Sequence, residues 1–437
     1  MKLFIIKAQI ILFIAGCLCT VGCLDKTTKS SNSFLTLQEV REDFYQLTEK
    51  IEKEVPNAFY NCDKSDYELV KQKAYNQLTD GMTTQSLYRV LYPLVQYLND
   101  AHFSVHLPDD IMNDSKISYF PIKVLIHNDR LYALEDLSSE PQIKKGEEIL
   151  FINTISSKEI LERIKGTTYQ NKRDQLFFEQ RNEAVFHRRL YSLFGFTGNF
   201  EIKTTDNIYF KNGINAEKLN ALPTKDYDFK MLNSGIAYLK INRLTLPQDS
   251  LKNTLKNNFN TLKEQSINKL IIDIRGNLGG NSALAKNIFD YFTDTPYTLA
   301  VGVDYFSKGK RIHSDTRSQI HNPQTIRDKF QGQVVLISDV LTYSSAHMMQ
   351  VGFKYHNLGI TVGNESSESL YITGEIKQTV LKNSKIELIA PTVNFELLGY
   401  SADKKEYYRP DYEIYPSLED RLNGNDLLLS KALEILN

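Results

Sequence analysis

Hydrophobic positions near the N-terminus recur at the spacing of an amphipathic helix. From Leu87 to Leu98 the apolar residues follow one another at alternating intervals of three and one positions, which places them on one face of a helix. Thr83 and Thr84 stand just ahead of this stripe, where a threonine side chain can cap the first turn. The pattern predicts a helical domain over residues 36–117, with its apolar stripes as core.

The next stretch changes to short apolar runs broken by turns. YFPIKVLIHNDRLYALEDL predicts two strands joined by a polar Asn-Asp turn, and GEEILFINTISSKEILERI predicts a strand, a turn and a helix. The segment IKKGEEILFINTISSKEIL resembles the second half of a PDZ domain, which binds extended peptides by adding a strand to its edge. Residues 118–166 are therefore expected to form a PDZ-like module, and a small β-rich spacer is the alternative.

From about residue 235, buried strands alternate with helices. The predicted strands are GIAYLKINRL, KLIIDIRGNLGG, QVVLISD, GITVGN and KIELIAPTV, and the predicted helices are NSALAKNIFDYF and SSAHMMQVGFKYHN. Apolar runs of this length between helices favour a largely parallel sheet with crossover connections. In such sheets, functional residues collect where strand ends meet helix N-termini. Residues 167–437 are accordingly expected to form an α/β core.

The first 23 residues have the features of an export signal. Their apolar run is short for a membrane span, and the tetrapeptides that end at Cys17 and Cys23 resemble the cleavage site of a bacterial lipoprotein. Cys23 is favoured as the lipidated residue because it lies at the apolar-to-polar border, where the polar tether 24–35 begins. An uncleaved anchor or a plain secretory signal is the alternative, and either would still place the protein in the periplasm or at the cell surface. Cys62 then stands alone, which argues against an intrachain disulfide.

Composition adds only exclusions. The 437 residues are 41% hydrophobic and 24% charged, as in ordinary globular proteins. Fifty-two basic and 53 acidic residues give a net charge of −1, so no basic excess draws the chain to nucleic acid.

Three segments contain residues suited to catalysis. In DIRGNLGG, residues 273–280, a glycine loop follows a strand and precedes a helix, where backbone N–H groups can hold an anion. The loop lacks the G-x-G-x-x-G of a dinucleotide site and the Lys-Ser/Thr pair of a P-loop. An oxyanion hole is therefore the better functional interpretation, and a plain turn is the alternative.

The second segment is LTYSSAHMM, in which Ser344 and Ser345 stand at a strand-to-helix junction. A hydroxyl there lies at the positive end of the helix dipole, beside N–H donors that can stabilise an attacked carbonyl. The alternative is that the serines merely cap the helix.

The third segment is LNDAHFSVHLP, in which His102, Ser104 and His106 share one face if the segment is a strand. Histidine is the commonest base for a serine nucleophile. A metal site on His102 and His106 is not expected, because no Cys, Asp or Glu at ligand spacing joins them.

In this order, the segments resemble the tail-specific (C-terminal processing) serine peptidases, in the branch akin to tricorn protease. The resemblance covers roughly residues 35–437 and rests on LNDAH, GEEILFIN, AYLKIN, DIRGNLGGNS, VVLISDVLTYSSA, GITVGN and RPDYEI…NGNDLLLSKALEIL. It implies an α/β fold with a crotonase-like (ClpP/crotonase) catalytic core, an N-terminal helical part and a PDZ-like module. It also implies a peptide or protein substrate and no cofactor or metal.

The resemblance assigns roles by position. Ser344 matches the family nucleophile, and the N–H groups of Ser345 and of Gly279 or Gly280 match the oxyanion hole. In one branch the base is a lysine about 25 residues after the nucleophile, but this chain has Ser369 there.

In the tricorn-like branch the base is a histidine of the N-terminal half, and His102 fits that position. The family places an acidic residue shortly before the terminal Pro-Asp pair. Glu406 is favoured slightly over Asp403 for this role, whereas Asp100 is expected to orient backbone rather than the imidazole ring. Leu278 departs from the Gly or Pro of the family loop.

Two other functions fit the same fold. One is a peptide- or glycan-binding surface lipoprotein with a decayed site, favoured by departures from the family at Ala101, Phe103 and Leu278 and opposed by retention of Ser344 and His102. The other is crotonase-type acyl-CoA chemistry, which export away from CoA disfavours.

Overall fold

The computed structural model describes residues 34–165, 172–219, 225–232, 235–245, 247–307, 309–315, 320–326 and 329–437. The expected signal segment, both candidate lipidation cysteines and nearly all of the tether lie outside these ranges. No helix within them is both long enough and apolar enough to span a membrane.

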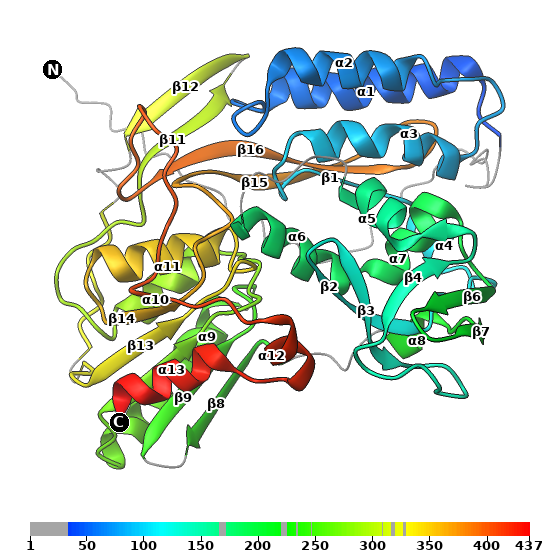
Figure 1. Ribbon diagram of the computed structural model, residues 1–437. Coiled ribbons are helices and arrows are strands. Elements are labelled where there is room, and N and C mark those ends of the chain that lie inside the picture. The colour runs from blue at the N-terminus through cyan, green and yellow to red at the C-terminus, as the bar shows by residue number, and fades with distance from the viewer. Residues whose placement is uncertain are drawn as a thin grey trace, which may run out of the picture.

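The N-terminal part is helical, as its periodicity predicts. It comprises α1 (Leu37–Glu54), α2 (Lys64–Tyr75), α3 (Thr84–Tyr97), the short strand β1 (Ser104–His106) and α4 (Asp109–Met112). The Thr83 side chain accepts a hydrogen bond from the backbone N–H of Ser86 and caps α3, which confirms that predicted cap. The first three helices lie together at one end of the molecule (Figure 1), and their apolar stripes are buried in one core.

A small sheet follows, in the strand order β2-β3-β4-β6-β7, with β5 paired to β4. Its elements are β2 (Ile122–His127), β3 (Arg130–Asp136), β4 (Glu148–Ile152), β5 (Ile155–Ser156), α5 (Ser157–Lys165), β6 (Asn199–Thr204) and β7 (Ile208–Asn212). Asn128 and Asp129 join β2 to β3 with φ values of 51° and 58°, the left-handed conformation that a two-residue hairpin requires. The predicted hairpin is confirmed. The sheet also extends past residue 166, because β6 pairs with β4.

Between α5 and β6 the chain is mostly helical, and two further short helices lie outside the sheets. These elements are α6 (Lys172–Glu183), α7 (Phe186–Arg189), the π-helix η1 (Leu190–Phe194), α8 (Ala216–Leu219) and α12 (Leu418–Asn423).

The predicted alternation of strands and helices builds a six-stranded sheet in the order β17-β14-β13-β10-β9-β8. Its strands are β8 (Tyr227–Leu232), β9 (Ile236–Ile241), β10 (Lys269–Asp273), β13 (Gln333–Ile337), β14 (Ile360–Gly363) and β17 (Tyr412–Glu413). All neighbours are parallel except β8 and β9, so the expected parallel sheet is confirmed.

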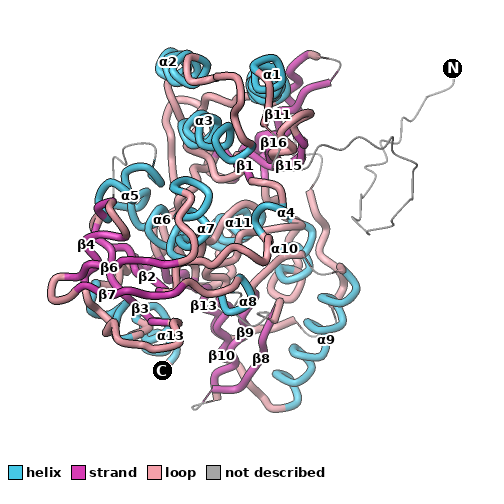
Figure 2. Tube along the Cα trace, turned by 90° about the vertical axis from the view of Figure 1, so that its right-hand side faces the viewer, coloured by secondary structure: helices cyan, strands magenta, loops and turns pink. Residues whose placement is uncertain are grey.

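Helices cover both faces of this sheet, which explains its continuous apolar strands. On one face, α9 (Gln248–Glu264), α10 (Ser282–Phe289) and α11 (Ser345–Tyr355) share a core with alternate strand residues. On the other face, α13 (Leu427–Leu436) packs on the remaining ones. Figure 2 shows the sheet between these helices.

A third sheet is antiparallel and connects the other parts. It has the order β1-β16-β11-β12, with β15 also paired to β16, and comprises β11 (Ala300–Ser307), β12 (Lys310–Asp315), β15 (Tyr371–Val380) and β16 (Glu387–Leu397) in addition to β1. The segment KIELIAPTV, which lies mostly in β16, therefore belongs here and not to the parallel sheet. Because β1 pairs with β16, the residues just ahead of β1 are brought beside the α/β core.

Candidate active site

A cleft of about 1250 Å³ lies between the parallel sheet and the antiparallel sheet. Its lining comes from the segment ahead of β1, the glycine loop after β10, the turn before α11 and strands β15 and β16. The lining includes His102, His106, Leu278, Gly279, Gly280, Ser344, Ser345, Met348, Thr373 and Phe395. All three segments that the sequence singled out thus meet in one cavity.

Ser344 stands at a sharp turn between β13 and α11. It is the residue immediately before the helix, but its side chain makes no capping hydrogen bond. Its backbone has φ 56° and ψ −125°, a conformation that costs a non-glycine residue about 1–3 kcal/mol and that clusters at functional sites. A serine that only capped the helix would have extended backbone and a bonded hydroxyl, and Ser344 has neither.

The glycine loop packs directly on this turn. A Cβ atom on Gly279 would lie 2.8 Å from Ser344 Cβ and 2.8 Å from the backbone nitrogen of Ser345. The Ser345 hydroxyl donates a hydrogen bond of 2.6 Å to the carbonyl oxygen of Gly280. The backbone N–H of Tyr343 donates one of 2.9 Å to the carbonyl oxygen of Asn277. Glycine is required at position 279 because any side chain would push the loop off the serine turn.

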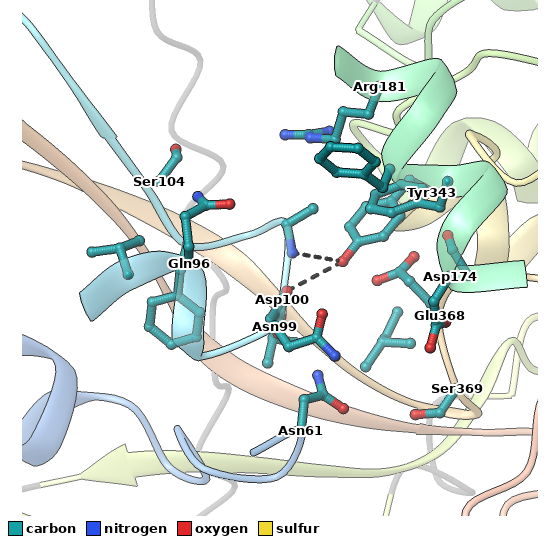
Figure 3. Close-up of a pocket in the computed structure, with 18 of the residues that line it drawn as sticks. Asn61, Gln96, Asn99, Asp100, Ser104, Asp174, Arg181, Tyr343, Glu368 and Ser369 are labelled. Carbon is teal, nitrogen blue, oxygen red and sulfur yellow. Dashed lines mark hydrogen bonds between the residues drawn. The ribbon is translucent and has the colours of Figure 1, made fainter. Parts of the chain in front are cut away.

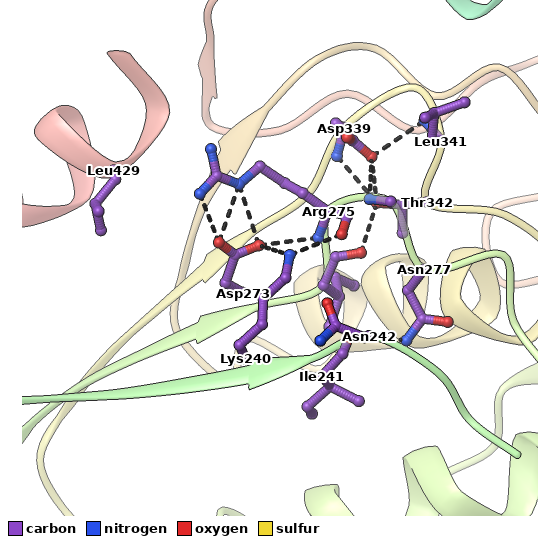
Figure 4. Close-up of polar contacts among 12 residues, drawn as sticks. Lys240, Ile241, Asn242, Asp273, Arg275, Asn277, Asp339, Leu341, Thr342 and Leu429 are labelled. Carbon is purple, nitrogen blue, oxygen red and sulfur yellow. Dashed lines mark hydrogen bonds and ion pairs between the residues drawn. The ribbon is translucent and has the colours of Figure 1, made fainter. Parts of the chain in front are cut away.

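The base of the loop is held by a buried ionic network (Figure 4). Asp273 accepts hydrogen bonds from Lys240, at 2.9 Å, and from Arg275, at 2.6 Å. Burial alone would raise the pKa of Asp273, but the Arg275 hydrogen bond and the charge of Lys240 outweigh it and lower the pKa to about 2. Arg275 also binds Asp426 at the start of α13, at 2.6 Å. The start of the loop is therefore tied to β9 through Lys240 and to the start of α13 through Asp426.

His102 is buried, with polar contacts at one ring nitrogen only. Its Nδ1 lies 2.9 Å from Thr373 Oγ1 and 3.2 Å from Asp100 Oδ1. The Thr373 hydroxyl in turn donates to Asp100 Oδ2, at 2.7 Å. No described residue is within hydrogen-bond distance of Nε2, so the ring is not bonded to Ser344 in this structure. Catalytic contacts of this kind often form only once substrate is bound.

A second carboxylate, Glu368, lies between the histidine and the serine. Its Oε1 is 3.7 Å from His102 Nδ1, and its Oε2 accepts a hydrogen bond from the backbone N–H of Ser344. Burial raises the pKa of Glu368 to about 8, with a further contribution from the charge of Asp100. For His102, burial lowers the pKa, but the hydrogen bond to Asp100 and the charges of Asp100 and Glu368 outweigh it, and the net shift is upward.

The Tyr343 side chain holds the segment ahead of His102 by hydrogen bonds. Its hydroxyl accepts a hydrogen bond of 3.0 Å from the backbone N–H of Ala101 and donates one of 3.2 Å to Asp100 Oδ1. Figure 3 shows Tyr343, Asp100 and Glu368 around an inner pocket of about 110 Å³. The aromatic residue next to the candidate nucleophile therefore positions the carboxylate that contacts His102.

Two expectations about the acid and the strand need correction. Glu406 forms an ion pair with Lys404 at 2.5 Å, and Asp403 is exposed in a turn; neither side chain contacts His102. The reason is that the segment ahead of the Pro-Asp pair is bonded by its backbone to the residues just ahead of β15, with the N–H of Leu370 donating to the Glu406 carbonyl. His102 also precedes β1 rather than sharing a strand face with His106.

The residues that do contact the ring were missed or undervalued. Asp100 was expected to bind backbone, and it does accept from the His102 N–H at 2.9 Å, but it also contacts the ring. Glu368 stands one position before Ser369, the residue at the family's lysine position, so a search for any titratable group there would have found it. Nothing in the sequence singles out Thr373.

The family comparison fits this geometry. Residues 235–388 match the family model of peptidase family S41. This part of the chain is similar to peptidase family S41. The match includes the glycine loop, Ser344 and Glu368, whereas His102 lies outside it. The expectation of a serine-type peptidase of the tail-specific (C-terminal processing) family is confirmed at this level.

Solved structures resemble the whole chain in fold. A crystal structure of a serine-to-alanine mutant of CPAF has a TM-score of 0.67 at 12% identity, covering 92% of this chain and 97% of that chain. Mature CPAF has a TM-score of 0.63 at 12% identity, covering 91% and 98%. No curated protein matches this chain. At such identities the likeness establishes a common fold, and the roles of individual residues must come from the site itself.

Proposed function

We propose that this protein is an exported serine peptidase that hydrolyses peptide bonds through an acyl-enzyme on Ser344, with His102 as the general base. The observation that carries the proposal is that both residues line one cleft, with the Ser344 hydroxyl free of any capping bond in a strained turn.

The contacts at Nδ1 support Nε2 as the nitrogen that acts as base. The single proton of the Thr373 hydroxyl is directed to Asp100, so this hydroxyl and Asp100 Oδ1 both present lone pairs to His102 Nδ1. Neutral His102 therefore carries its proton on Nδ1, which leaves the lone pair of Nε2 for the serine proton. Asp100 holds the tautomer and stabilises the imidazolium, the role of the third member of a catalytic triad.

The oxyanion hole is assigned to the N–H groups of Gly280 and Ser345. The N–H of Gly279 donates a hydrogen bond of 2.9 Å to the side chain of Asn277, so it is already engaged. No backbone acceptor for the N–H of Gly280 or Ser345 is found in the described part of the chain. Ser345 is also the first residue of α11, where the helix dipole favours negative charge.

The reaction then proceeds in two steps. His102 Nε2 takes the Ser344 proton as Oγ attacks the peptide carbonyl, and the N–H groups of Gly280 and Ser345 hold the negative oxygen. The imidazolium protonates the leaving amine, and the acyl-enzyme remains. Water, activated by the same nitrogen, releases the second product and restores Ser344.

Other parts of the proposal concern location and modules. We propose that the core is crotonase-like, that the N-terminal segment directs export, and that Cys23 or Cys17 carries a lipid. We also propose that residues 118–166 form a PDZ-like peptide-binding module, supported by a groove of about 750 Å³ between α5 and the strands β3 and β4. Titration with unstructured peptides, followed by fluorescence, tests the module separately from catalysis.

Catalysis is tested with a mixed peptide library read by mass spectrometry. The wild-type protein should cleave peptides, and Ser344→Ala and His102→Ala should not. An activated ester should leave an acyl adduct on Ser344 of the wild type, visible by intact mass. A folded wild-type protein that neither cleaves nor acylates would overturn the proposal and favour a peptide- or glycan-binding protein with a decayed site.

A further inference from the structure

A row of polar side chains crosses the antiparallel sheet away from the cleft. Thr373 on β15 pairs with Asn394 on β16, which pairs with Asp304 on β11, which pairs with His313 on β12. Paired residues present their side chains on the same face. The row therefore begins at the His102 contact and, at about 5 Å a strand, ends roughly 15 Å away at His313.

Three potential metal ligands converge at the far end of this row. One ligand atom each from Asp304, His313 and Glu396 lies within 4.8 Å of the others. His313 Nδ1 is 3.1 Å from Asp304 Oδ1 and 4.0 Å from Glu396 Oε1. Ligand atoms about 2.0–2.2 Å from a tetrahedral zinc ion are separated by roughly 3.3–3.6 Å. The observed separations bracket that value, so small rotations of two side chains would complete the geometry.

Asp304 is held in the orientation that a ligand needs. Its Oδ2 accepts hydrogen bonds from the Tyr371 hydroxyl, at 2.6 Å, and from Arg311, at 2.7 Å. The side chain is almost fully buried, at 4% exposure, and Oδ1 is turned to His313. Metal-binding carboxylates are characteristically fixed in this way by outer hydrogen bonds.

The sheet also leaves space for the group. Gly302 on β11 pairs with Glu396, and a Cβ atom there would lie 2.3 Å from Glu396 Oε2 and 2.9 Å from His313 Cε1. Any other residue would separate the two ligands. Asn394, next to Asp304 in the row, is fully buried, and both of its amide atoms lack a partner among the described residues. This buried amide leaves a donor and an acceptor beside Asp304 that could interact with a water bound to an ion at the site.

We propose that Asp304, His313 and Glu396 form a binding site for a divalent transition-metal ion of the zinc class. One imidazole and two carboxylates suit such an ion, and water completes its coordination. His313 is 54% exposed, which gives the ion a path from solvent. The alternative is that the same residues form only an ion-pair network around Asp304 and Arg311.

Isothermal titration of the tag-free, chelator-treated protein with Zn²⁺ distinguishes a metal site from a simple ion-pair network. We expect one equivalent bound with micromolar affinity, at least tenfold weaker in His313→Ala and in Glu396→Gln. His321→Ala is the matched control, because His321 contacts a single carboxylate, Asp290, at 2.8 Å, and it should bind as the wild type does.

A second readout is the visible spectrum of Co²⁺ bound in place of zinc, which should show the bands of a tetrahedral site and lose them in His313→Ala. Circular dichroism confirms that each variant is folded. Zinc binding unchanged in both variants, or lost in His102→Ala instead, would overturn the proposal, as would the absence of binding by the wild type.

Discussion

The backbone N–H of Ser344 donates a hydrogen bond to the carboxyl group of Glu368, 24 residues further along the chain. This bond joins the candidate nucleophile to the loop ahead of β15, and the other oxygen of Glu368 faces His102. Two carboxyl groups thus share one side of the imidazole. Hydrogen bonding separates their roles. Burial raises the pKa of both groups, but at Asp100 the bonds to His102 and Thr373 outweigh it and the net shift is downward, whereas at Glu368 burial dominates and raises the pKa to about 8.

Asp100 is expected to be the carboxylate that catalysis needs. Asp100→Asn should lower kcat/KM by about 10²–10⁴-fold, because the amide would stabilise the wrong imidazole tautomer and leave the imidazolium without its counter-charge. Steady-state cleavage of a fluorogenic peptide measures the loss. Glu406→Gln and Asp403→Asn are the controls and should stay within about threefold of the wild type. A large loss of activity in either control, with Asp100→Asn still active, would show that the acidic residue is the one expected from the family and not Asp100.

Glu368 is expected to destabilise the fold as pH rises. Its pKa is about 8 when folded, against an ordinary 4.5, so between these values the folded state binds more protons than the unfolded state. The free energy of unfolding then falls with pH across that window. Glu368→Gln lacks this dependence. The difference between its free energy of unfolding and that of the wild type should therefore rise from pH 5 to pH 8 and then level off.

Urea unfolding at several pH values checks this expectation. Glu375→Gln, which removes an exposed carboxylate from β15, controls for the loss of one charge. If the difference in free energy of unfolding between Glu368→Gln and the wild type stays constant across pH, Glu368 ionises normally in the folded protein.

The glycine loop offers a matched pair of substitutions. Gly279→Ala should reduce kcat by at least about 10²-fold, because its Cβ would collide with Ser344 and Ser345 and displace the oxyanion donors. Gly276→Ala also imposes strain at positive φ, but nothing lies within 4 Å of its Cβ. It should cost about 1 kcal/mol of stability and leave kcat nearly unchanged. Equal activity losses in the two variants would argue against contact between loop and serine as the cause.

The strained backbone of Ser344 predicts a trade of stability for activity. Ser344→Gly should abolish cleavage yet raise the free energy of unfolding by about 1 kcal/mol, because glycine adopts φ 56° without penalty. Ser344→Ala is equally inactive but keeps the Cβ atom, so it should gain none of this stability. Thermal and urea unfolding of both variants test this prediction. If Ser344→Gly is no more stable than Ser344→Ala, the backbone of Ser344 does not store strain.

The sequence by itself determined the local elements. Such elements depend on residues that are close together in the sequence, so their spacing can be read directly from it. Examples are the helical stripe from Leu87, the Asn128-Asp129 turn and the alternation of buried strands with helices. The sequence also pointed to Ser344, His102 and the glycine loop, because each stands in a recognisable short segment.

Tertiary structure alone decided which groups surround His102 and where β16 pairs. Thr373 is 271 residues from His102, and no local pattern records a contact across that separation. The family position pointed to Glu406, but its carbonyl is bonded to Leu370, just ahead of β15, and its side chain pairs with Lys404. The pairing of β1 and β15 with β16 brought Thr373 to the ring instead, together with the segments just ahead of β1 and β15 that contain Asp100 and Glu368. Strand register fixes which distant residues lie side by side.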